Sequence, residues 1–258
     1  MTRTPDLRKP VDDYLEAQQR VIDHWWAIQA QADVLGPSAL HATSEATLSA
    51  CATNWESFRT DWHIRAIACD ATQFRAWVTK RVVDAAAKSD EKVKALIKGI
   101  QDDPEGRFEV ALPKHPTMER VAGMLDPNDY NLTFKDKKSS DAKAENHLVP
   151  SLAKLPKSLD YLDWNVLSLM VATRNAIAHG SAGSMEHLKE AMSDIAEVHD
   201  KQVAALGRPK GSVPSTGIGR YLTVTPQRPS GQARGTVWKP RVITICERVR
   251  EMGEKFRP

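Results

Sequence analysis

Apolar residues recur at three- and four-residue steps along most of the chain, the spacing of helices that bury one face. Residues from Val11 to Leu35 read as one helix that Gly36 and Pro37 end, and a second, longer apolar row runs from Leu48 to Cys69. Further helices are predicted over 71–87, 90–100, 116–125, 161–178, 185–206 and 241–256. The pattern predicts an all-α fold, a bundle with long antiparallel helices.

Four segments interrupt this helical pattern. YNLTF, residues 130–134, reads as a short extended piece, and the polar run KDKKSSDAKAEN after it reads as an exposed loop. GRPKGSVPSTGIG, residues 207–219, is rich in Gly, Pro and Ser and reads as a linker. RYLTVT, residues 220–225, is expected to form a strand.

Composition is that of a soluble globular protein, with 41% hydrophobic and 27% charged residues. No run reaches the roughly 18 apolar residues that a membrane-spanning helix needs, and the first residues lack the apolar core of a signal peptide. A cytoplasmic protein with no membrane association is expected. Cys51, Cys69 and Cys246 are widely spaced and odd in number, so they are read as reduced thiols.

Charge is distributed unevenly along the chain. Residues 207–258 contain eleven Lys and Arg but only three Asp and Glu. The other 206 residues contain 25 Lys and Arg and 30 Asp and Glu. We therefore divide the chain into a helical domain, 1–206, and a basic linker with a C-terminal helix, 207–258, which could pack on that domain. Basic segments attract polyanions by counterion release, so the extension is either a nucleic-acid clamp or a solvated tail.

The predicted helix that begins at Tyr161 is apolar on two sides. One row contains Leu162, Val166, Leu169, Met170, Thr173 and Ile177, and a second contains Trp164, Leu167, Val171, Arg174 and Ala178. Between them lies a strip of small and polar residues: Ser168, Ala172, Asn175 and His179. Two apolar rows indicate burial on two sides, and one of the neighbours could be a second subunit.

The segment RNAIAHG, residues 174–180, ends this helix with reactive side chains. Arg174 and His179 are separated by about 140° around the helix axis and roughly 7.5 Å along it, whereas Asn175 and His179 share a face. Gly180 suits the left-handed residue beyond a helix, which places His179 in the last turn, where the helix dipole favours a protonated imidazole.

Two interpretations of this helix end are open. In one, it is merely capped, and Arg174 pairs with Asp163, Asp194 or backbone carbonyls. In the other, the flexible Arg174 reaches toward a groove lined by Asn175 and His179, and together they form a reactive site.

RNAIAHG resembles the signature of the HEPN superfamily, in which an arginine and a polar residue precede a histidine at the end of a helix in an all-α bundle. NWESFRTDW, residues 54–62, and LDPNDYNLTF, residues 125–134, are similar to segments that precede the signature in HEPN domains of the RiboL-PSP type. The likeness covers about residues 45–205 and leaves the N-terminal helix and the basic extension unexplained.

The resemblance implies a homodimer in which two signature motifs face each other and cut RNA without a metal ion. His179 would exchange a proton with the ribose 2′-hydroxyl or the leaving 5′-oxygen, Arg174 would bind the scissile phosphate, and Asn175 would orient either of them. Glu56 matches the acidic residue that an earlier helix sometimes adds to the site, although it could instead be a solvated partner of Arg59. The product would carry a 2′,3′-cyclic phosphate.

The sequence contains no motif typical of metal-dependent or nucleotide-binding enzymes. There is no HExxH, no Cys/His pair with metal spacing and no GxxxxGK[ST] loop, so no metal or cofactor is expected. His63, next to Trp62, is read as structural or exposed.

Three hypotheses remain open. The first is a toxin-like or phage-defence endoribonuclease, restrained by an antitoxin or a neighbouring subunit. The second is a non-catalytic HEPN-fold adaptor that binds RNA or protein in a multi-component defence complex. The third is a purely structural helical dimer.

Overall fold

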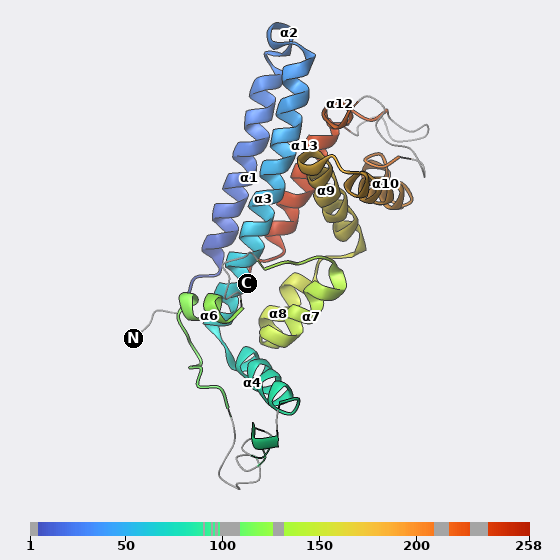
Figure 1. The fold of residues 1–258 in the computed structure, drawn as a ribbon. Coiled ribbons are helices and arrows are strands. Elements are labelled where there is room, and N and C mark those ends of the chain that lie inside the picture. Colours follow the sequence, from blue (N-terminus) through green and yellow to red (C-terminus); the bar gives the residue numbers. More distant parts are fainter. Residues whose placement is uncertain are drawn as a thin grey trace. The chain divides into compact units, whose positions relative to one another are not determined.

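The first three helices form an antiparallel hairpin. The computed structural model describes residues 5–89, 91–93, 95, 98, 109–125, 132–208, 217–227 and 237–258. Helix α1 spans Arg8–Gln29, α2 spans Ala32–Leu35 and α3 spans Pro37–Cys69, and α1 and α3 lie side by side (Figure 1). Gly36 has a φ of 79°, a conformation that side chains disfavour, and Pro37 begins α3 where no N–H is required. The Gly-Pro pair therefore makes the turn.

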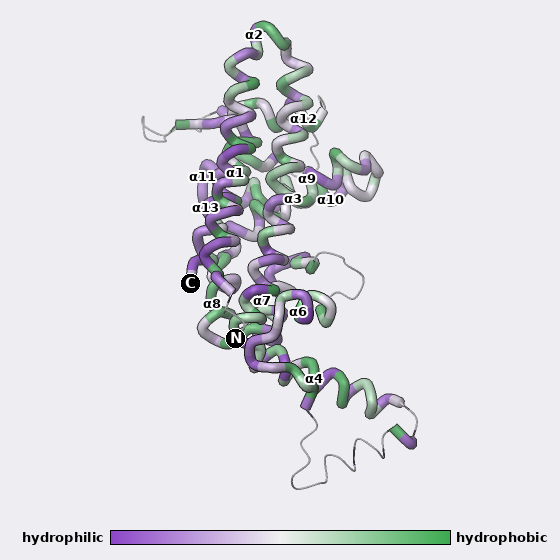
Figure 2. The backbone as a smooth tube through the Cα atoms, turned by 90° about the vertical axis from the view of Figure 1, so that its left-hand side faces the viewer, coloured by the Kyte–Doolittle hydropathy of each residue, from purple (hydrophilic) through white to green (hydrophobic). Residues whose placement is uncertain are grey.

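The prediction of one helix up to Leu35 is wrong in detail. The N–H of Gln31 donates to the Ile28 carbonyl three residues back, which tightens the last turn and separates α1 from α2. The short α2 carries exposed apolar side chains, with Val34 88% and Leu35 45% exposed. Figure 2 shows this hydrophobic end of the hairpin in green.

The chain forms two compact units. Unit 1 consists of residues 60–158 together with residues 1–7 and 258, and unit 2 consists of residues 8–59 and 159–257. Unit 2 is thus built from the two ends of the sequence, and its C-terminal half contains α9 Tyr161–His179, α10 Ala182–Ala196, α11 Lys201–Ala204, α12 Ile218–Thr223 and α13 Arg241–Glu254. Helices α12 and α13, both from the basic extension, belong to this unit.

An aromatic cluster forms the core of unit 2. Tyr14 of α1 stacks on Phe58 of α3 with ring centroids 4.4 Å apart, and Phe256 meets Phe58 edge-on at 5.3 Å. The Tyr14 hydroxyl donates to the Val249 carbonyl of α13 at 2.8 Å. Because α13 also packs against α9, the extension completes the core that α1 and α3 begin.

Unit 1 consists of shorter helices. They are α4 Thr72–Ala86, α6 Met118–Leu125, α7 Lys137–His147 and α8 Pro150–Lys157, with α7 packed against α4 and α8. The last part of α3, from Thr60, also belongs to this unit. The helix predicted over 90–100 lies largely outside the described residues, and those of its residues that are described are helical. The prediction of α6 is confirmed, while the DPND stop after it and the start of YNLTF lie outside the described residues.

Every regular element in the described part of the chain is a helix, so the all-α prediction is confirmed. Three local predictions are wrong. Most of residues 135–146, predicted as a loop, lies in α7, because Asp136 and Ser139 make a reciprocal capping box that begins a helix at Lys137. The predicted strand 220–225 lies largely in helix α12. The helix predicted over 185–206 ends at Ala196, and Asp200 then caps the start of a separate short helix, α11.

No helix among the described residues is long and apolar enough to cross a membrane. The three cysteines are free thiols, as predicted: Cys51 and Cys246 are buried, and Cys69 is half-buried. A hydrogen bond with Cys51, together with burial, raises the pKa of Cys246 well above its ordinary value.

Candidate functional site

Local signals define both ends of helix α9. At its start, Asp160 accepts from the Asp163 N–H and Asp163 accepts from the Asp160 N–H, each at 2.9 Å, which satisfies two otherwise unpaired donors. At its end, Gly180 is left-handed with a φ of 56°, and its N–H donates to the Ala176 carbonyl at 3.0 Å. The predicted position of His179 in the last turn is confirmed.

Over residues 164–170 both apolar rows of α9 are buried within the chain, whereas Val171 and Ile177 are half-buried and Ala178 is exposed. Val166, Leu169 and Met170 of the first row are at most 1% exposed, and Trp164 and Leu167 of the second are 7% and 3% exposed. Helices α10 and α13 pack against α9. Burial on two sides therefore gives no reason to invoke a second subunit, and the homodimer depends on the HEPN resemblance alone.

One strip of α9 stays open to solvent. Ser168 and His179 are exposed, Asn175 is half-buried, and only Ala172 among the predicted strip residues is buried. The strip continues to Tyr161, seven residues before Ser168, which is 71% exposed. Sequence reasoning missed Tyr161, although the seven-residue steps from Asn175 back to Ser168 and Tyr161 could have indicated it.

Glu56 and Arg174 meet within unit 2. The Arg174 Nη2 donates to both carboxylate oxygens of Glu56, at 2.6 Å to Oε1 and 2.7 Å to Oε2. The Arg174 side chain is 29% exposed and the Glu56 side chain 38%. Helix α3 therefore presents its carboxylate to the motif arginine, 118 residues further along the chain.

Two of the alternative partners have other contacts. Asp163, one of the carboxylates considered for Arg174, accepts from Lys255 Nζ at 2.5 Å. The guanidinium of Arg59, considered as a partner of Glu56, lies over the Phe256 ring, with Cζ 4.9 Å from the centroid. Arg174 and Glu56 pair with each other rather than with these two neighbours.

The guanidinium of Arg174 keeps unused donor capacity. Its Nε is buried and has no hydrogen-bond partner among the described residues, since only Nη2 binds Glu56. A buried N–H without an acceptor is unfavourable, so the guanidinium would gain a hydrogen bond if it turned toward an acceptor. The Glu56 carboxylate consequently holds the Arg174 side chain in place, but it does not use all of the hydrogen-bond donors of the guanidinium.

Asn175 and His179 complete the motif without joining this ion pair. In the described part of the chain, neither side chain has a hydrogen bond or ion pair. His179 is the last residue of α9 and is exposed, so its imidazole can reach a ligand that approaches from solvent. The structure therefore brings together Glu56 and Arg174 and leaves Asn175 and His179 beside open surface.

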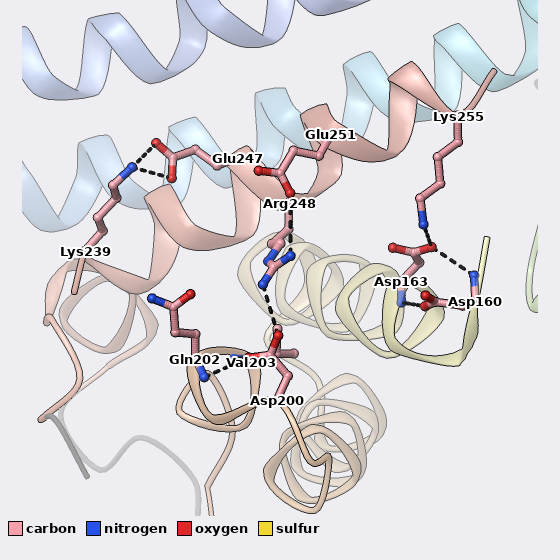
Figure 3. A network of polar contacts seen from close by, with 10 residues as sticks. All are labelled: Asp160, Asp163, Asp200, Gln202, Val203, Lys239, Glu247, Arg248, Glu251 and Lys255. Atoms are coloured by element: carbon pink, nitrogen blue, oxygen red, sulfur yellow. Dashed lines mark hydrogen bonds and ion pairs between the residues drawn. The ribbon is translucent and has the colours of Figure 1, made fainter. Parts of the chain in front are cut away.

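Several basic residues of the extension form ion pairs within unit 2 (Figure 3). Lys239 binds Glu247 at 2.6 Å, and Arg248 binds Asp200 at 3.1 Å. Lys255 binds Asp163 at 2.5 Å, across to the start of α9. Because these charges hold α13 on its neighbours, its ion-paired residues are poorly suited to serve as a clamp for nucleic acid.

Metal ligands do not gather in the part of the chain that the structure describes, where no three His, Cys, Asp or Glu side chains lie close enough to hold an ion. His63, read from the sequence as structural or exposed, is 2% exposed, and its Nε2 lies 3.0 Å from Nδ1 of the buried His147. Burial, with the charges of Lys143 and Arg81, lowers the pKa of His147 from 6.5 to about 4. This buried pair is structural.

Comparison of the chain with protein-family models, with curated proteins and with solved structures gave no match. The likeness to HEPN domains therefore depends on the RNAIAHG motif and on the segments before it.

Proposed function

We propose that this chain is a metal-independent endoribonuclease of the HEPN type, which cuts RNA at a site built on Arg174, Asn175 and His179. The observation that carries the proposal is the Glu56–Arg174 ion pair. It joins the motif arginine to the carboxylate that the family resemblance implied, from a helix far away in sequence. A capped helix end has no need of that partner.

The reaction requires two proton transfers and charge stabilisation. The ribose 2′-oxygen attacks phosphorus and the bond to the 5′-oxygen breaks, which leaves a 2′,3′-cyclic phosphate. The His179 imidazole removes the 2′-proton or delivers a proton to the 5′-oxygen, and two copies facing each other supply both roles. The guanidinium of Arg174 binds the phosphate oxygens, on which negative charge builds up.

Glu56 serves to hold and mask the arginine. In the absence of RNA it balances the positive charge and fixes the position of the guanidinium beside α3. A phosphate then competes with the carboxylate for Nη2. Asn175, on the same face of the helix as His179, orients the imidazole or the phosphate by hydrogen bonding.

Homodimerisation would use the open strip of α9. Tyr161, Ser168, Asn175 and His179 of this helix are accessible or only partly covered by their own chain. Contact between two such strips would bring two motifs together. A toxin-like or defence role, with an antitoxin or complex subunit covering the same strip, fits this arrangement.

A second candidate is a HEPN-fold adaptor that binds RNA or protein without cutting it. The same ion pair favours it, because a carboxylate that stays on Arg174 would keep phosphate away. Cleavage separates the two candidates.

The test is incubation of total cellular RNA in EDTA with the wild type, Arg174→Ala, His179→Ala and a control, His187→Ala. His187 is an exposed histidine of α10, outside the motif, so it controls for loss of an imidazole as such. We expect cutting that leaves 2′,3′-cyclic phosphates and falls by about 10²–10⁴-fold without His179, as for other general acid–base groups. The His187→Ala variant should retain full activity.

Two results would contradict the ribonuclease. One is unchanged cutting by both motif variants, which would point to a contaminant. The other is the absence of cutting by a folded, dimeric wild type on total RNA, which would leave the adaptor as the better explanation.

A further inference from the structure

Unit 1 carries aromatic rings and cations on a surface that plays no part in the site described above. Trp77 and Arg81 come from α4, with the Arg81 Cζ 5.1 Å from the Trp77 ring centroid. Phe134 lies just before α7 and Lys143 within it, with the Lys143 Nζ 5.9 Å from the Phe134 centroid. We call these four residues the basic–aromatic face.

The buried histidine pair joins the two halves of this face. The His147 ring lies 4.4 Å from Trp77, and the His63 ring lies 5.4 Å from Phe134. Since His63 and His147 are hydrogen-bonded to each other, the two aromatic rings are held on one rigid support. Arg81 and Lys143 both lie near enough to lower the pKa of His147, so the two cations are neighbours of the same buried ring.

These rings and charges are accessible. Trp77, Phe134 and Lys143 are half-buried, and Arg81 is exposed. No carboxylate within the described ranges forms an ion pair with Arg81 or Lys143, in contrast to Lys239, Arg248 and Lys255 of the extension, which are all paired. The extension was the sequence-based candidate for holding RNA. Its Arg241 also lies over an aromatic ring, but that ring, Tyr221, is buried. The rings beside Arg81 and Lys143 in unit 1 are partly exposed.

We infer that the basic–aromatic face binds single-stranded RNA. The inference rests on the proposed function for its choice of ligand and extends it to a binding surface outside the motif. Phosphates contact Arg81 and Lys143, and bases stack on the partly exposed rings or on the Arg81 guanidinium plane, as is usual for single strands. A duplex keeps its bases inside and offers the rings no stacking partner.

The test is fluorescence anisotropy of a labelled, mixed-sequence 20-nucleotide strand with 2′-O-methyl riboses, titrated with the full chain. The methyl groups block attack by the 2′-oxygen, so binding is measured whether or not the protein cuts RNA. The variant is Arg81→Gln with Lys143→Gln. Its matched control is Lys201→Gln with Arg220→Gln, which removes the same charge from exposed positions in unit 2.

We expect the unit 1 double variant to weaken binding about tenfold and to lower the salt slope by about 1.4, or roughly 0.7 for each phosphate contact. The control should stay within about twofold of the wild type. Trp77→Leu, checked for folding by circular dichroism, should weaken binding by roughly 5- to 100-fold through lost stacking. The wild type should bind the single strand more tightly than the same strand annealed to its complement.

The inference would be overturned if the wild type and the Arg81/Lys143 variant had the same affinity and salt slope. It would also be overturned if the Lys201/Arg220 control lost as much RNA affinity as the Arg81/Lys143 variant. Equal binding of duplex and single strand would also overturn it, because it would indicate charge attraction alone. Failure of the proposed function would appear differently, as absent cleavage in EDTA with this binding pattern intact.

Discussion

Glu56→Gln perturbs the candidate site at its most informative point. The substitution preserves the size of the side chain and its hydrogen-bonding capacity but removes the charge that faces Arg174. If Glu56 masks Arg174, the substitution should lower the stability of the protein but raise its affinity for RNA. The protein loses stability because an ion pair is lost, and it binds RNA phosphate more tightly because a competitor is lost.

The size of both effects follows from the exposure of the pair. With the Arg174 side chain 29% and the Glu56 side chain 38% exposed, solvent screens the attraction, so the pair belongs at the upper end of the surface range, about 1 kcal/mol. For a chain of this size, about 1 kcal/mol lowers the Tm by roughly 2–4 °C. The same free energy, released to the phosphate, corresponds to about fivefold tighter RNA binding.

The assay combines urea unfolding at 25 °C with anisotropy of the 2′-O-methyl strand, for Glu56→Gln, Arg174→Gln and the double variant. The double variant should show a coupling of about 1 kcal/mol in stability. Glu186→Gln is the control, since Glu186 pairs with Lys189 on α10 and its side chain is 60% exposed. Weaker RNA binding by Glu56→Gln, or a coupling no larger than a few tenths of a kcal/mol, would refute the masking role.

Two further predictions concern the units that carry these sites. Gly253→Ala should destabilise unit 2 by about 1–2 kcal/mol in urea unfolding, because a Cβ there would overlap the Tyr14 ring and outweigh the gain in helix propensity. Gly183→Ala, with open space around it, should be neutral or stabilising, and an equal loss in both would contradict this packing argument. Below pH 6.5 the unfolded chain protonates His147, whereas the folded chain does not until about pH 4. Between these pH values, the free energy of unfolding of the wild type should therefore fall by about 3 kcal/mol more than that of His147→Gln. Parallel pH profiles of the two proteins, measured by urea unfolding, would show that this histidine does not titrate differently on folding.

Helical periodicity predicts the long helices because their apolar rows are what the core buries. It failed at α7, where only Ser140, Ala144 and His147 are buried and the helix depends on its capping box and on packing against α4 and α8. It also failed at α12, where β-branched and aromatic letters suggested a strand but Tyr221 and Leu222 are buried in a helix against α13. Tertiary packing outweighed local propensity in both segments.

The candidate site was only partly accessible to sequence reasoning. The glycine after His179 and the helical step from Asn175 to His179 follow from spacing. The pairing of Glu56 with Arg174 does not, since it depends on how α3 lies against α9, and only the family resemblance suggested it. The basic–aromatic face was missed because Trp77 and Phe134 are 57 positions apart and meet only through two histidines.

The discontinuity of unit 2 has a consequence for the protein during its synthesis. Tyr14 of helix α1 is translated 235 residues ahead of Val249, whose carbonyl accepts a hydrogen bond from its hydroxyl, and the Phe256 ring of the same core comes later still. Unit 2 therefore cannot finish folding until α13 has been translated. A nascent chain that has already emerged with Glu56 and Arg174 would still lack the α13 side chains that complete the core around them.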